Sequence, residues 1–402
     1  MNILLVCNKF PFPPRDGGSL ASYNMAKGLM ETGNQVDLLA MNTSKHFSRH
    51  GTSDIDIKGM GRVRSVNIDN SISYSGVFYN LLFSSIPYNA RQFINRRFSE
   101  VLAEMLREKS YDIIQLEGLY LWPYVKTIRE NTRAKIAYRA HNVEHVIWDT
   151  YNKRRKSSYK KWYIGKMQKR IRNYEQEFIN SYDLLATVTA IDLEILNSMG
   201  NEKPSLVAPF GMWPDEYPEN NKSDNGCFLL QYIGALDWLP NIESLNWFIE
   251  RVWTVAKEKY PEIRFCVAGS NAKKSYVNYL INNGIDFMGE IDDSREYLSQ
   301  NSIFVAPLFS GSGIRVKVIE AMFMGKPILA TSYAVSGIPV ENGKQILMAR
   351  DEHNFIECID KLLADPDYAN RLGVNAREFS HQYFDNSAIA EELAAFYKKN
   401  LI

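Results

Sequence analysis

One stretch of the chain decides its fold: Ala306-Pro307-Leu308-Phe309-Ser310-Gly311-Ser312-Gly313-Ile314-Arg315-Val316-Lys317-Val318-Ile319-Glu320-Ala321-Met322. An apolar run ends at Ala306, a loop of glycines and serines follows, and a helical pattern continues through Glu320. Glycines let the backbone approach a ligand closely, and a helix N-terminus presents unpaired N–H groups to an anion. This order of strand, loop and helix predicts a phosphate-binding loop.

Two cations stand where this helix is expected to begin. Positive charge from Arg315 and Lys317 opposes the helix dipole there, so it is unfavourable unless an anion is also bound. The mismatch therefore favours a bound phosphate. Glu320 lies further along the helix, where its carboxylate could accept hydrogen bonds from sugar hydroxyls. The alternative is a solvated Glu320 on a helix with a flexible entry loop.

Short apolar runs alternate with helical patterns on both sides of this stretch. We expect strands at 3–6, 36–40, 113–116, 136–139, 184–188, 206–208, 228–234, 264–268, 303–306 and 328–330. Helices are expected at 19–31, 243–259, 316–324 and 355–363. Strands separated by helices predict parallel sheets with crossover helices, which is the α/β class.

The length of 402 residues favours two domains. Residues 213–226 are rich in Pro, Asn, Asp, Glu and Gly, which is typical of a linker. We therefore expect an N-terminal Rossmann-like domain at 1–212 and a C-terminal one at 227–385. Residues 386–402 are expected to form a helix that crosses back to the first domain. Parallel sheets bind ligands at the carboxyl ends of their strands, which predicts a cleft between the domains.

Composition excludes several classes of function. The net charge is +1, so no global field attracts nucleic acid, and 45% apolar with 23% charged residues fits a globular protein. The N-terminal run is too short for a signal peptide or a membrane span, and we expect a cytoplasmic location. The four cysteines form no CxxC pair, and the histidines lack metal-ligand spacing, so no metal site is expected.

A second centre follows another expected strand, in Tyr138-Arg139-Ala140-His141-Asn142-Val143-Glu144-His145. A lone histidine is more often structural than catalytic, but strand ends face the ligand in this class of fold. His141 is therefore a candidate catalytic residue, with Asn142 beside it. Glu144 could orient the imidazole or cap the following helix, and the sequence does not separate these roles.

Residues 153–172 contain ten Lys and Arg and no acid. Within and beyond this segment, apolar residues recur at spacings of three and four: Ile164, Met167, Ile171, Tyr174 and Phe178. This pattern predicts a helix with an apolar stripe and a basic opposite face. Such a helix either packs on the first domain as a solvated surface element or contacts an anionic membrane from its inner face.

The stretch at 306–322 resembles the donor-binding segment of glycosyltransferase family 4, a family of the GT-B fold, also called glycosyl transferases group 1. Its Glu-x7-Glu motif places a ribose-binding glutamate at Glu320, whereas the first glutamate is replaced by Ser312. Relatives with a GSG-type loop share this replacement. In them the loop, here Ser312, Gly313 and Ile314, holds the diphosphate with an Arg and a Lys that match Arg315 and Lys317.

Other segments resemble the same family. Arg15-Asp16-Gly17-Gly18 resembles the first loop, whose paired glycines approach the donor phosphate and the acceptor. Gly289-Glu290-Ile291-Asp292-Asp293 resembles the loop that touches the nucleotide base, and Ile291 would do so through its backbone. His141 matches a histidine that contacts the donor sugar. Gly234 to Asn241 stands where many members carry a further Arg and Lys.

The resemblance implies a retaining glycosyltransferase that uses a UDP- or GDP-sugar, with a cell-surface glycan or lipid-linked acceptor. It needs no cofactor, because Arg315 and Lys317 would stabilise the leaving diphosphate where other enzymes use a metal. Asp54-Ile55-Asp56 resembles a metal-binding pair only in its spacing, in the region that matches least. A dehydrogenase is disfavoured because no strand is followed by GxGxxG. Ser312 gives some weight to a non-catalytic carbohydrate- or nucleotide-sugar-binding protein of the same fold.

Overall fold

The computed structural model describes residues 1–14, 16–44, 47–49, 57, 59–71, 80, 84–153, 158–218, 229–310 and 313–401. The chain divides into two compact units, Met1–Met212 with Asn386–Ile402 and Trp213–Asp385. Residues 219–226 of the predicted linker lie outside the described residues. The residues before them belong to the second unit, where the rings of Tyr217 and Phe323 lie 5.1 Å apart.

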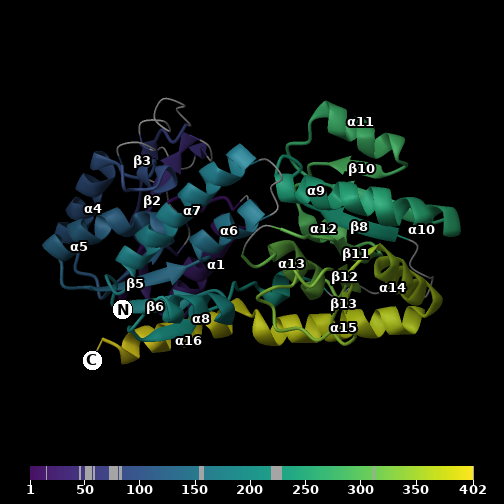
Figure 1. Cartoon of the computed structure of the whole chain (residues 1–402). Coiled ribbons are helices and arrows are strands. Elements are labelled where there is room, and N and C mark those ends of the chain that lie inside the picture. The colour runs from purple at the N-terminus through teal and green to yellow at the C-terminus, as the bar shows by residue number, and fades with distance from the viewer. Residues whose placement is uncertain are drawn as a thin grey trace. The chain divides into compact units, whose positions relative to one another are not determined.

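The first unit contains a parallel sheet, seven-stranded within the described residues, in the order β3-β2-β1-β4-β5-β6-β7 (Figure 1). Its strands are β1 (Asn2–Cys7), β2 (Gln35–Thr43), β3 (Val63–Ile68), β4 (Ile113–Glu117), β5 (Lys135–Ala140), β6 (Leu184–Thr187) and β7 (Ser205–Val207). Its helical elements are α1 (Gly17–Glu31), α3 (Tyr88–Arg91), α4 (Arg96–Glu108), η3 (Leu119–Tyr124), α5 (Val125–Asn131), α6 (Glu144–Lys153), α7 (Ser158–Phe178), α8 (Ala190–Ser198) and α16 (Asn386–Lys399).

Alternate residues of the central strands face opposite layers of helices. On one face, Leu4 belongs to the same buried cluster as Leu102 of α4 and Ile128 of α5. On the other, Ile3 shares a cluster with Met25 of α1 and with α16. Both faces of a parallel sheet are covered in this way, which explains the continuous apolar runs in the sequence.

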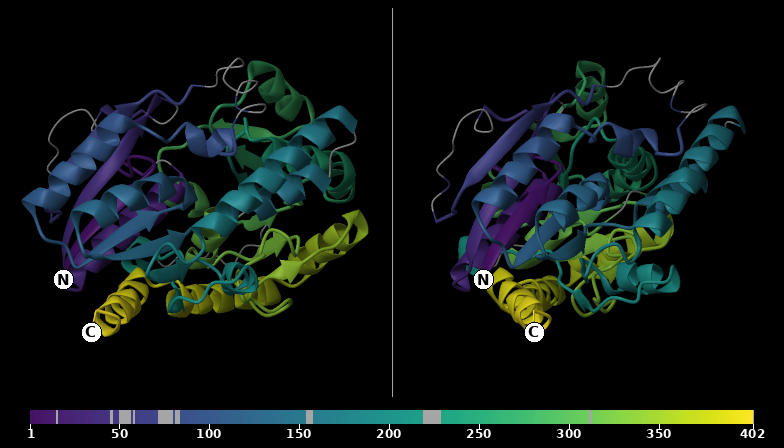
Figure 2. Two further views of the ribbon diagram at one scale, coloured as in Figure 1. Left: turned by 60° about the vertical axis from the view of Figure 1, so that its left-hand side comes forward. Right: turned by 90° about the vertical axis from the view of Figure 1, so that its left-hand side faces the viewer.

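The C-terminal helix α16 is part of the first unit because it packs tightly on α1. A Cβ atom at Gly28 would lie 2.6 Å from Ala390 Cβ, so only glycine fits at this crossing. Asn386 Nδ2 donates to the Asn24 carbonyl at 2.8 Å, and Asn24 Nδ2 donates to the Gly211 carbonyl at 2.8 Å. Both chain termini consequently lie on this unit (Figure 2).

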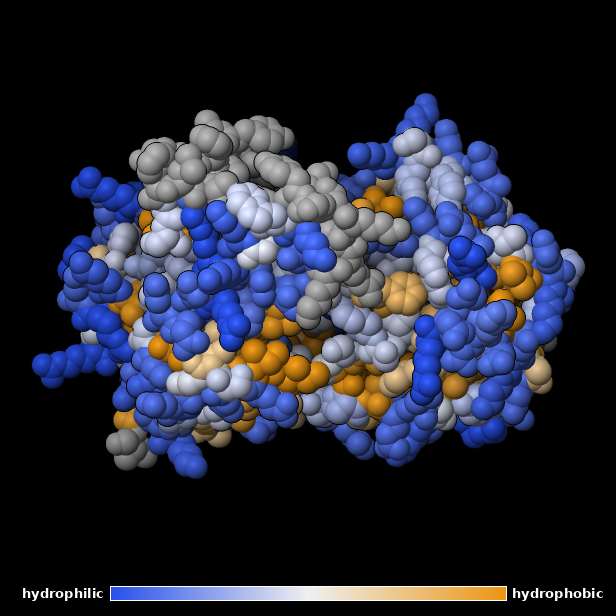
Figure 3. Space-filling view, viewed as in Figure 1, coloured by the Kyte–Doolittle hydropathy of each residue, from blue (hydrophilic) through white to orange (hydrophobic). Residues whose placement is uncertain are grey.

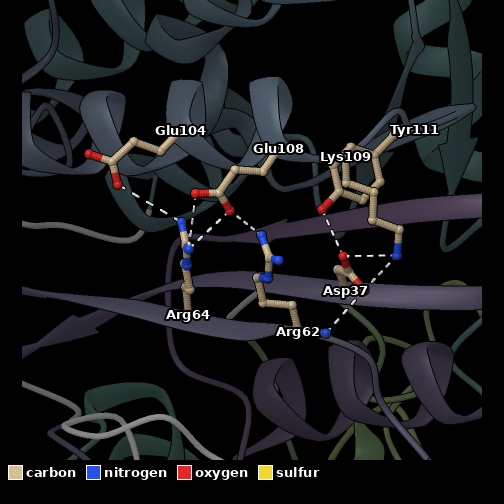
Figure 4. Close-up of polar contacts among 7 residues, drawn as sticks. All are labelled: Asp37, Arg62, Arg64, Glu104, Glu108, Lys109 and Tyr111. Carbon is tan, nitrogen blue, oxygen red and sulfur yellow. Dashed lines mark hydrogen bonds and ion pairs between the residues drawn. The ribbon is translucent and has the colours of Figure 1, made fainter.

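A network of polar side chains lies near the amino end of β2 (Figure 4). Parallel sheets bind ligands at the opposite, carboxyl ends of their strands. Asp37 is buried, and both its oxygens lie 3.0 Å from Lys109 Nζ. Tyr111 donates its hydroxyl hydrogen to Asp37 at 2.7 Å, and the Arg62 N–H donates at 3.1 Å. Arg62 and Arg64 also form ion pairs with Glu108 of α4. We assign this network to folding.

Helix α7 carries residues 158–172 of the basic segment and runs beside α6 in both views of Figure 2. Residues 154–157 of the segment lie outside the described residues. Its stripe of apolar side chains is buried, with exposed fractions of 6% or less: Ile164, Met167, Ile171, Tyr174 and Phe178. The predicted amphipathic helix is therefore confirmed, and its apolar stripe packs inside the protein. Lys161, Lys166 and Lys169 remain exposed. The face drawn in Figure 3 carries mainly hydrophilic residues. None of the described helices is long and apolar enough to cross a bilayer.

The second unit contains another parallel sheet, of six strands where the structure describes the chain, in the order β10-β9-β8-β11-β12-β13. The strands are β8 (Leu229–Ile233), β9 (Arg264–Ala268), β10 (Asp286–Gly289), β11 (Ile303–Ala306), β12 (Ile328–Ala330) and β13 (Leu347–Met348). The helical elements are η4 (Pro214–Glu216), α9 (Leu239–Phe248), η5 (Ile249–Trp253), α10 (Thr254–Lys259), α11 (Lys274–Asn282), α12 (Ser294–Leu298), α13 (Val316–Phe323), α14 (Glu352–Ala364) and α15 (Pro366–Tyr383). Two doubly wound sheets confirm the predicted α/β class.

Candidate active site

Strand order locates a candidate ligand-binding edge in each unit. In the first sheet the chain winds outward in opposite directions from β1 and β4, and in the second from β8 and β11. Open parallel sheets bind ligands beside the carboxyl ends of the two strands at such a switch point. The loops after β1 and β4, and those after β8 and β11, are therefore the places to look for chemistry.

The loop after β1 ends in a closed cap on α1. Asp16 accepts the N–H hydrogens of Gly18 and Ser19 at 3.0 Å each, and Lys9 Nζ lies 2.5 Å from the same carboxylate. A phosphate that bound these N–H groups would have to displace Asp16. A Cβ atom at Gly18 would make only ordinary contacts, at 3.4 and 3.5 Å. The fold itself therefore does not require glycine there. Gly17 opens the helix, and Arg15 lies outside the described residues.

His141 follows the last residue of β5, as the sequence predicted, and its side chain is 22% exposed. Its Nε2 atom lies 2.5 Å from Oε2 of Glu117, the last residue of the neighbouring strand β4. Asn142 lies in the same loop, half-buried. Sequence reasoning did not identify Glu117, although a carboxylate that ends the apolar run 113–116 is the kind of signal that could have revealed it.

Glu117 is buried and receives several hydrogen bonds. Ser22 Oγ donates at 2.9 Å and Arg139 Nη1 at 3.2 Å to Oε2, and the Gln115 amide donates to Oε1. Burial alone would raise the pKa of Glu117, but the charges of Arg139 and His141 outweigh it and lower the pKa to about 2. The carboxylate is therefore ionised at neutral pH.

Glu144 has different partners from those predicted. Its carboxylate accepts the Tyr120 hydroxyl at 2.9 Å, while His141 is held by Glu117. The helix α6 is capped instead by Glu175 of α7, which accepts the N–H groups of Glu144 and His145 at 2.7 and 3.1 Å. Both roles predicted for Glu144 are thus filled by other carboxylates. Burial, followed by the charge of Glu175, raises the pKa of Glu144 to about 7.

The candidate binding residues of the second unit lie at the start of α13. Arg315 is the residue before the helix and Lys317 is in its first turn, where the sequence predicted both cations. The Arg315 guanidinium donates to the Gly313 carbonyl and lies 5.3 Å from the Tyr333 ring centre. Gly313 has φ of 70°, a conformation that favours glycine. Ile314 lies half-buried in the same loop, whereas Gly311 and Ser312 lie outside the described residues.

Glu320 joins two segments that the sequence analysis had treated separately. It is 4% exposed, and its Oε1 atom accepts the Ser294 hydroxyl at 2.9 Å. Ser294 opens α12 directly after the loop that contains Ile291. On its other side, Lys317 Nζ forms an ion pair at 2.7 Å with Glu320 Oε2, without the geometry of a hydrogen bond. The structure therefore brings the predicted ribose, diphosphate and base segments to one place in this unit.

The described residues contain no group of three His, Cys, Asp or Glu side chains placed to hold a metal ion. Asp54 and Asp56 lie outside the described residues, as does Cys227. The other three cysteines, Cys7, Cys266 and Cys358, are buried free thiols.

Proteins with similar sequences and structures resemble this chain over nearly its whole length. The chain is 23% identical over 415 residues to a protein of Klebsiella pneumoniae described as an "Uncharacterized 44.6 kDa protein in cps region", covering 99% of both chains. It resembles the structure of sucrose-phosphate synthase from Thermosynechococcus elongatus with a TM-score of 0.73 at 16% identity, covering 99% of both. It also resembles Anabaena HepE in complex with UDP, with a TM-score of 0.65 at 14% identity, covering 99% of this chain and all of the other.

The two parallel sheets and these structural likenesses show the GT-B fold. More particularly, residues 227–365 match the family described as "Glycosyl transferases group 1". An archaeal relative from Methanocaldococcus jannaschii, described as an uncharacterized glycosyltransferase, is 24% identical over 247 residues and covers 59% of this chain and 58% of its own. The family match includes the stretch at 306–322, on which the resemblance in the sequence was recognised.

Proposed function

We propose that this enzyme transfers a sugar from a nucleoside diphosphate sugar to a hydroxyl group of a cell-surface glycan or lipid-linked acceptor, with retention of anomeric configuration. The observation that carries the donor assignment is the position of Glu320 between Ser294 and Lys317 at the start of α13. Structural relatives add support, since structures of Anabaena HepE are known in complex with UDP and with UDP-glucose. Retention and the acceptor class rest on the family resemblance.

In this proposal Glu320 accepts hydrogen bonds from the ribose hydroxyls, and Lys317 and Arg315 hold the diphosphate. Positive charge that is already in place stabilises the negative charge developing on the leaving diphosphate, so no metal ion is required. The loop at Gly313 and Ile314 approaches the phosphates, and the backbone at Ile291 contacts the base. In the first unit, Gly18 and His141 are the residues proposed to contact the donor phosphate and the sugar, respectively.

A panel of UDP- and GDP-sugars tests the donor assignment. Purified enzyme is incubated with each in EDTA, and release of the nucleoside diphosphate by slow hydrolysis is measured beside binding by calorimetry. We expect one nucleotide series to bind and to be hydrolysed without metal. A nucleotide that binds at a hundredfold its dissociation constant should add about 2.7 kcal/mol of stability. Binding without any hydrolysis or transfer would indicate a non-catalytic binding protein, and dependence on a divalent ion would contradict the metal-free mechanism.

Proton NMR of the released sugar tests retention. The coupling constant of the anomeric proton, recorded before mutarotation, should show the configuration of the donor. The opposite anomer would contradict a retaining reaction while leaving the donor assignment intact.

A further inference from the structure

A buried carboxylate lies behind the candidate catalytic histidine. The Glu117 side chain is 1% exposed, so it cannot reach a sugar itself. Its Oε2 atom lies 2.5 Å from His141 Nε2, and it also accepts hydrogen bonds from Ser22 and Arg139. Its Oε1 atom accepts from the Gln115 amide. Whatever Glu117 contributes to chemistry must therefore act through His141.

The direction of the hydrogen bond to His141 follows from the charge of Glu117. An ionised carboxylate has acceptors only, so the imidazole must donate, and Nε2 must carry a hydrogen. The other ring nitrogen, Nδ1, makes no hydrogen bond within the described part of the chain, while the side chain is 22% exposed. Nδ1 is therefore the atom of His141 that is left to meet a ligand.

Arg139 is the other ionised partner of Glu117. It is 1% exposed, and its Nη1 atom lies 3.2 Å from Oε2 of Glu117. The other titratable groups near Glu117 are Cys7 and Tyr397, and burial raises the pKa of both, so they remain neutral. The charge of Lys9, in the loop after β1, lowers the pKa of Cys7, but burial outweighs this effect. These groups leave Glu117 ionised, and its carboxylate fixes a hydrogen on Nε2 of His141.

We propose that Glu117 is the positioning residue of the site, which fixes the Nε2–H tautomer of His141 and turns Nδ1 toward the ligand as a hydrogen-bond acceptor. The group that Nδ1 would accept from is a hydroxyl of the sugar. This inference rests on the proposed function for the identity of the ligand, whereas the tautomer itself is a property of the protein alone.

Imidazole ¹⁵N NMR of the wild-type enzyme tests the tautomer directly. Long-range ¹H–¹⁵N spectra distinguish the two neutral forms, and comparison with His141→Gln assigns the signal. We expect neutral His141 to carry its hydrogen on Nε2. A hydrogen on Nδ1, or an even mixture of tautomers, would overturn the proposal. This measurement needs no substrate, so its result stands even if the enzyme transfers no sugar in the assays above.

Kinetics test the consequence. Glu117→Gln should lower kcat for transfer at least about tenfold, because a misplaced imidazole hydrogen blocks its function, and should shift the pH profile. Affinity for the nucleoside diphosphate should change less than about twofold, because Glu117 lies outside the second unit. Tyr397→Phe is the matched control, since it removes a buried hydrogen bond of 2.7 Å to Gln115 without touching Glu117.

Three outcomes would contradict a positioning role: unchanged kcat in Glu117→Gln, equal loss in Tyr397→Phe, or a parallel loss of nucleotide affinity. If Glu117→Gln fails to fold, the tautomer of the wild-type histidine still decides the question.

Discussion

Lys317 Nζ lies 2.7 Å from Oε2 of Glu320, three residues further along α13. The cation predicted to hold the diphosphate thus neutralises the carboxylate predicted to hold the ribose. The lysine is 42% exposed and the glutamate side chain 5%, so the lysine is the partner that can move. Nucleotide binding would replace this pair with two contacts to the ligand.

Lys317→Ala should weaken nucleoside diphosphate binding by at least about tenfold, or about 1.4 kcal/mol. The reason is the loss of a cation beside the diphosphate, and calorimetry measures it. Lys344→Ala is the control, because Lys344 forms a similar ion pair with Glu341 at 2.9 Å, also three residues apart, elsewhere in the same unit. Equal affinity in the Lys317 variant and wild type, with Arg315→Ala also unchanged, would remove the diphosphate from this loop.

Glu320→Gln should cost roughly 1.5–3 kcal/mol of nucleotide binding, since it replaces a charge-assisted hydrogen bond to ribose by a neutral one. The amide still fits beside Ser294, so we expect the melting temperature to stay close to that of the wild type. Nucleoside diphosphate and inorganic diphosphate are titrated in parallel. Affinity for inorganic diphosphate should hold, whereas a loss of folding without selective loss of nucleotide would indicate a structural glutamate.

The sequence was sufficient to predict those strands whose residues are buried without interruption. Strands such as β9 and β11 are apolar runs bounded by turn residues, and their bounds were predicted at 264–268 and 303–306. Three strands were not predicted: β3, in which Arg64 and Asn67 interrupt the apolar pattern, β10, and β13, which has only two residues. Edge strands are less buried, so their signal is weaker.

The candidate site could be predicted only where its residues are close in the chain. Arg315, Lys317 and Glu320 share one helix start, and the pattern placed them correctly. Glu117 and His141 are 24 residues apart and meet because β4 pairs with β5 in a register that sets Glu117 beside Arg139. Strand order and register are not visible in one sequence. Nearness in the chain favoured Glu144 instead, whose helix directs it to Tyr120.

Glu144→Gln should stabilise the enzyme at pH 8 relative to wild type and have a smaller effect at pH 5. Burial, and then Glu175, raise the pKa of Glu144 to about 7 in the folded protein, above the ordinary value of 4.5. Between these values the folded state binds the proton and the unfolded state does not, so the stability contributed falls as pH rises. Above pH 7 the buried charge is a cost that glutamine avoids.

Thermal unfolding of both proteins across pH 5–8 measures this difference. Glu177→Gln, a neighbouring change on α7, controls for the loss of one negative charge. A difference between Glu144→Gln and wild type that does not depend on pH would contradict the assigned titration.

The basic face of α7 is expected to attract anionic vesicles weakly at low salt. Each lysine near such a surface contributes about 1 kcal/mol, and salt screens it. The apolar stripe is buried, so binding should be electrostatic, without insertion of that stripe. Flotation at low and high salt compares wild type with Lys161→Gln/Lys166→Gln/Lys169→Gln. The control has the same charge change on other exposed lysines, Lys126→Gln/Lys398→Gln/Lys399→Gln. Equal flotation of the two variants would assign α7 to folding alone.

His141→Ala should reduce transfer and spare nucleotide binding. His141 lies at the strand end of the first unit, whereas Glu320, Lys317 and Arg315 belong to the second unit and are the residues proposed to hold the nucleotide. A single positioned polar group that acts in the transition state contributes about 10²–10³ in rate. Single-turnover transfer should fall by this factor, and calorimetry should give an unchanged affinity for the nucleoside diphosphate.

The melting temperature decides between a catalytic and a structural histidine, because His141→Ala also removes a contact to the buried carboxylate of Glu117. His145→Ala is the matched control, since His145 makes the same kind of contact, at 2.6 Å, to the buried carboxylate of Glu175. If both histidines serve folding, both variants should melt earlier and lose transfer and binding together. Loss of turnover in the His141 variant alone, at equal melting temperatures, is the result we expect, and near-normal transfer would leave the second unit as the only supported site.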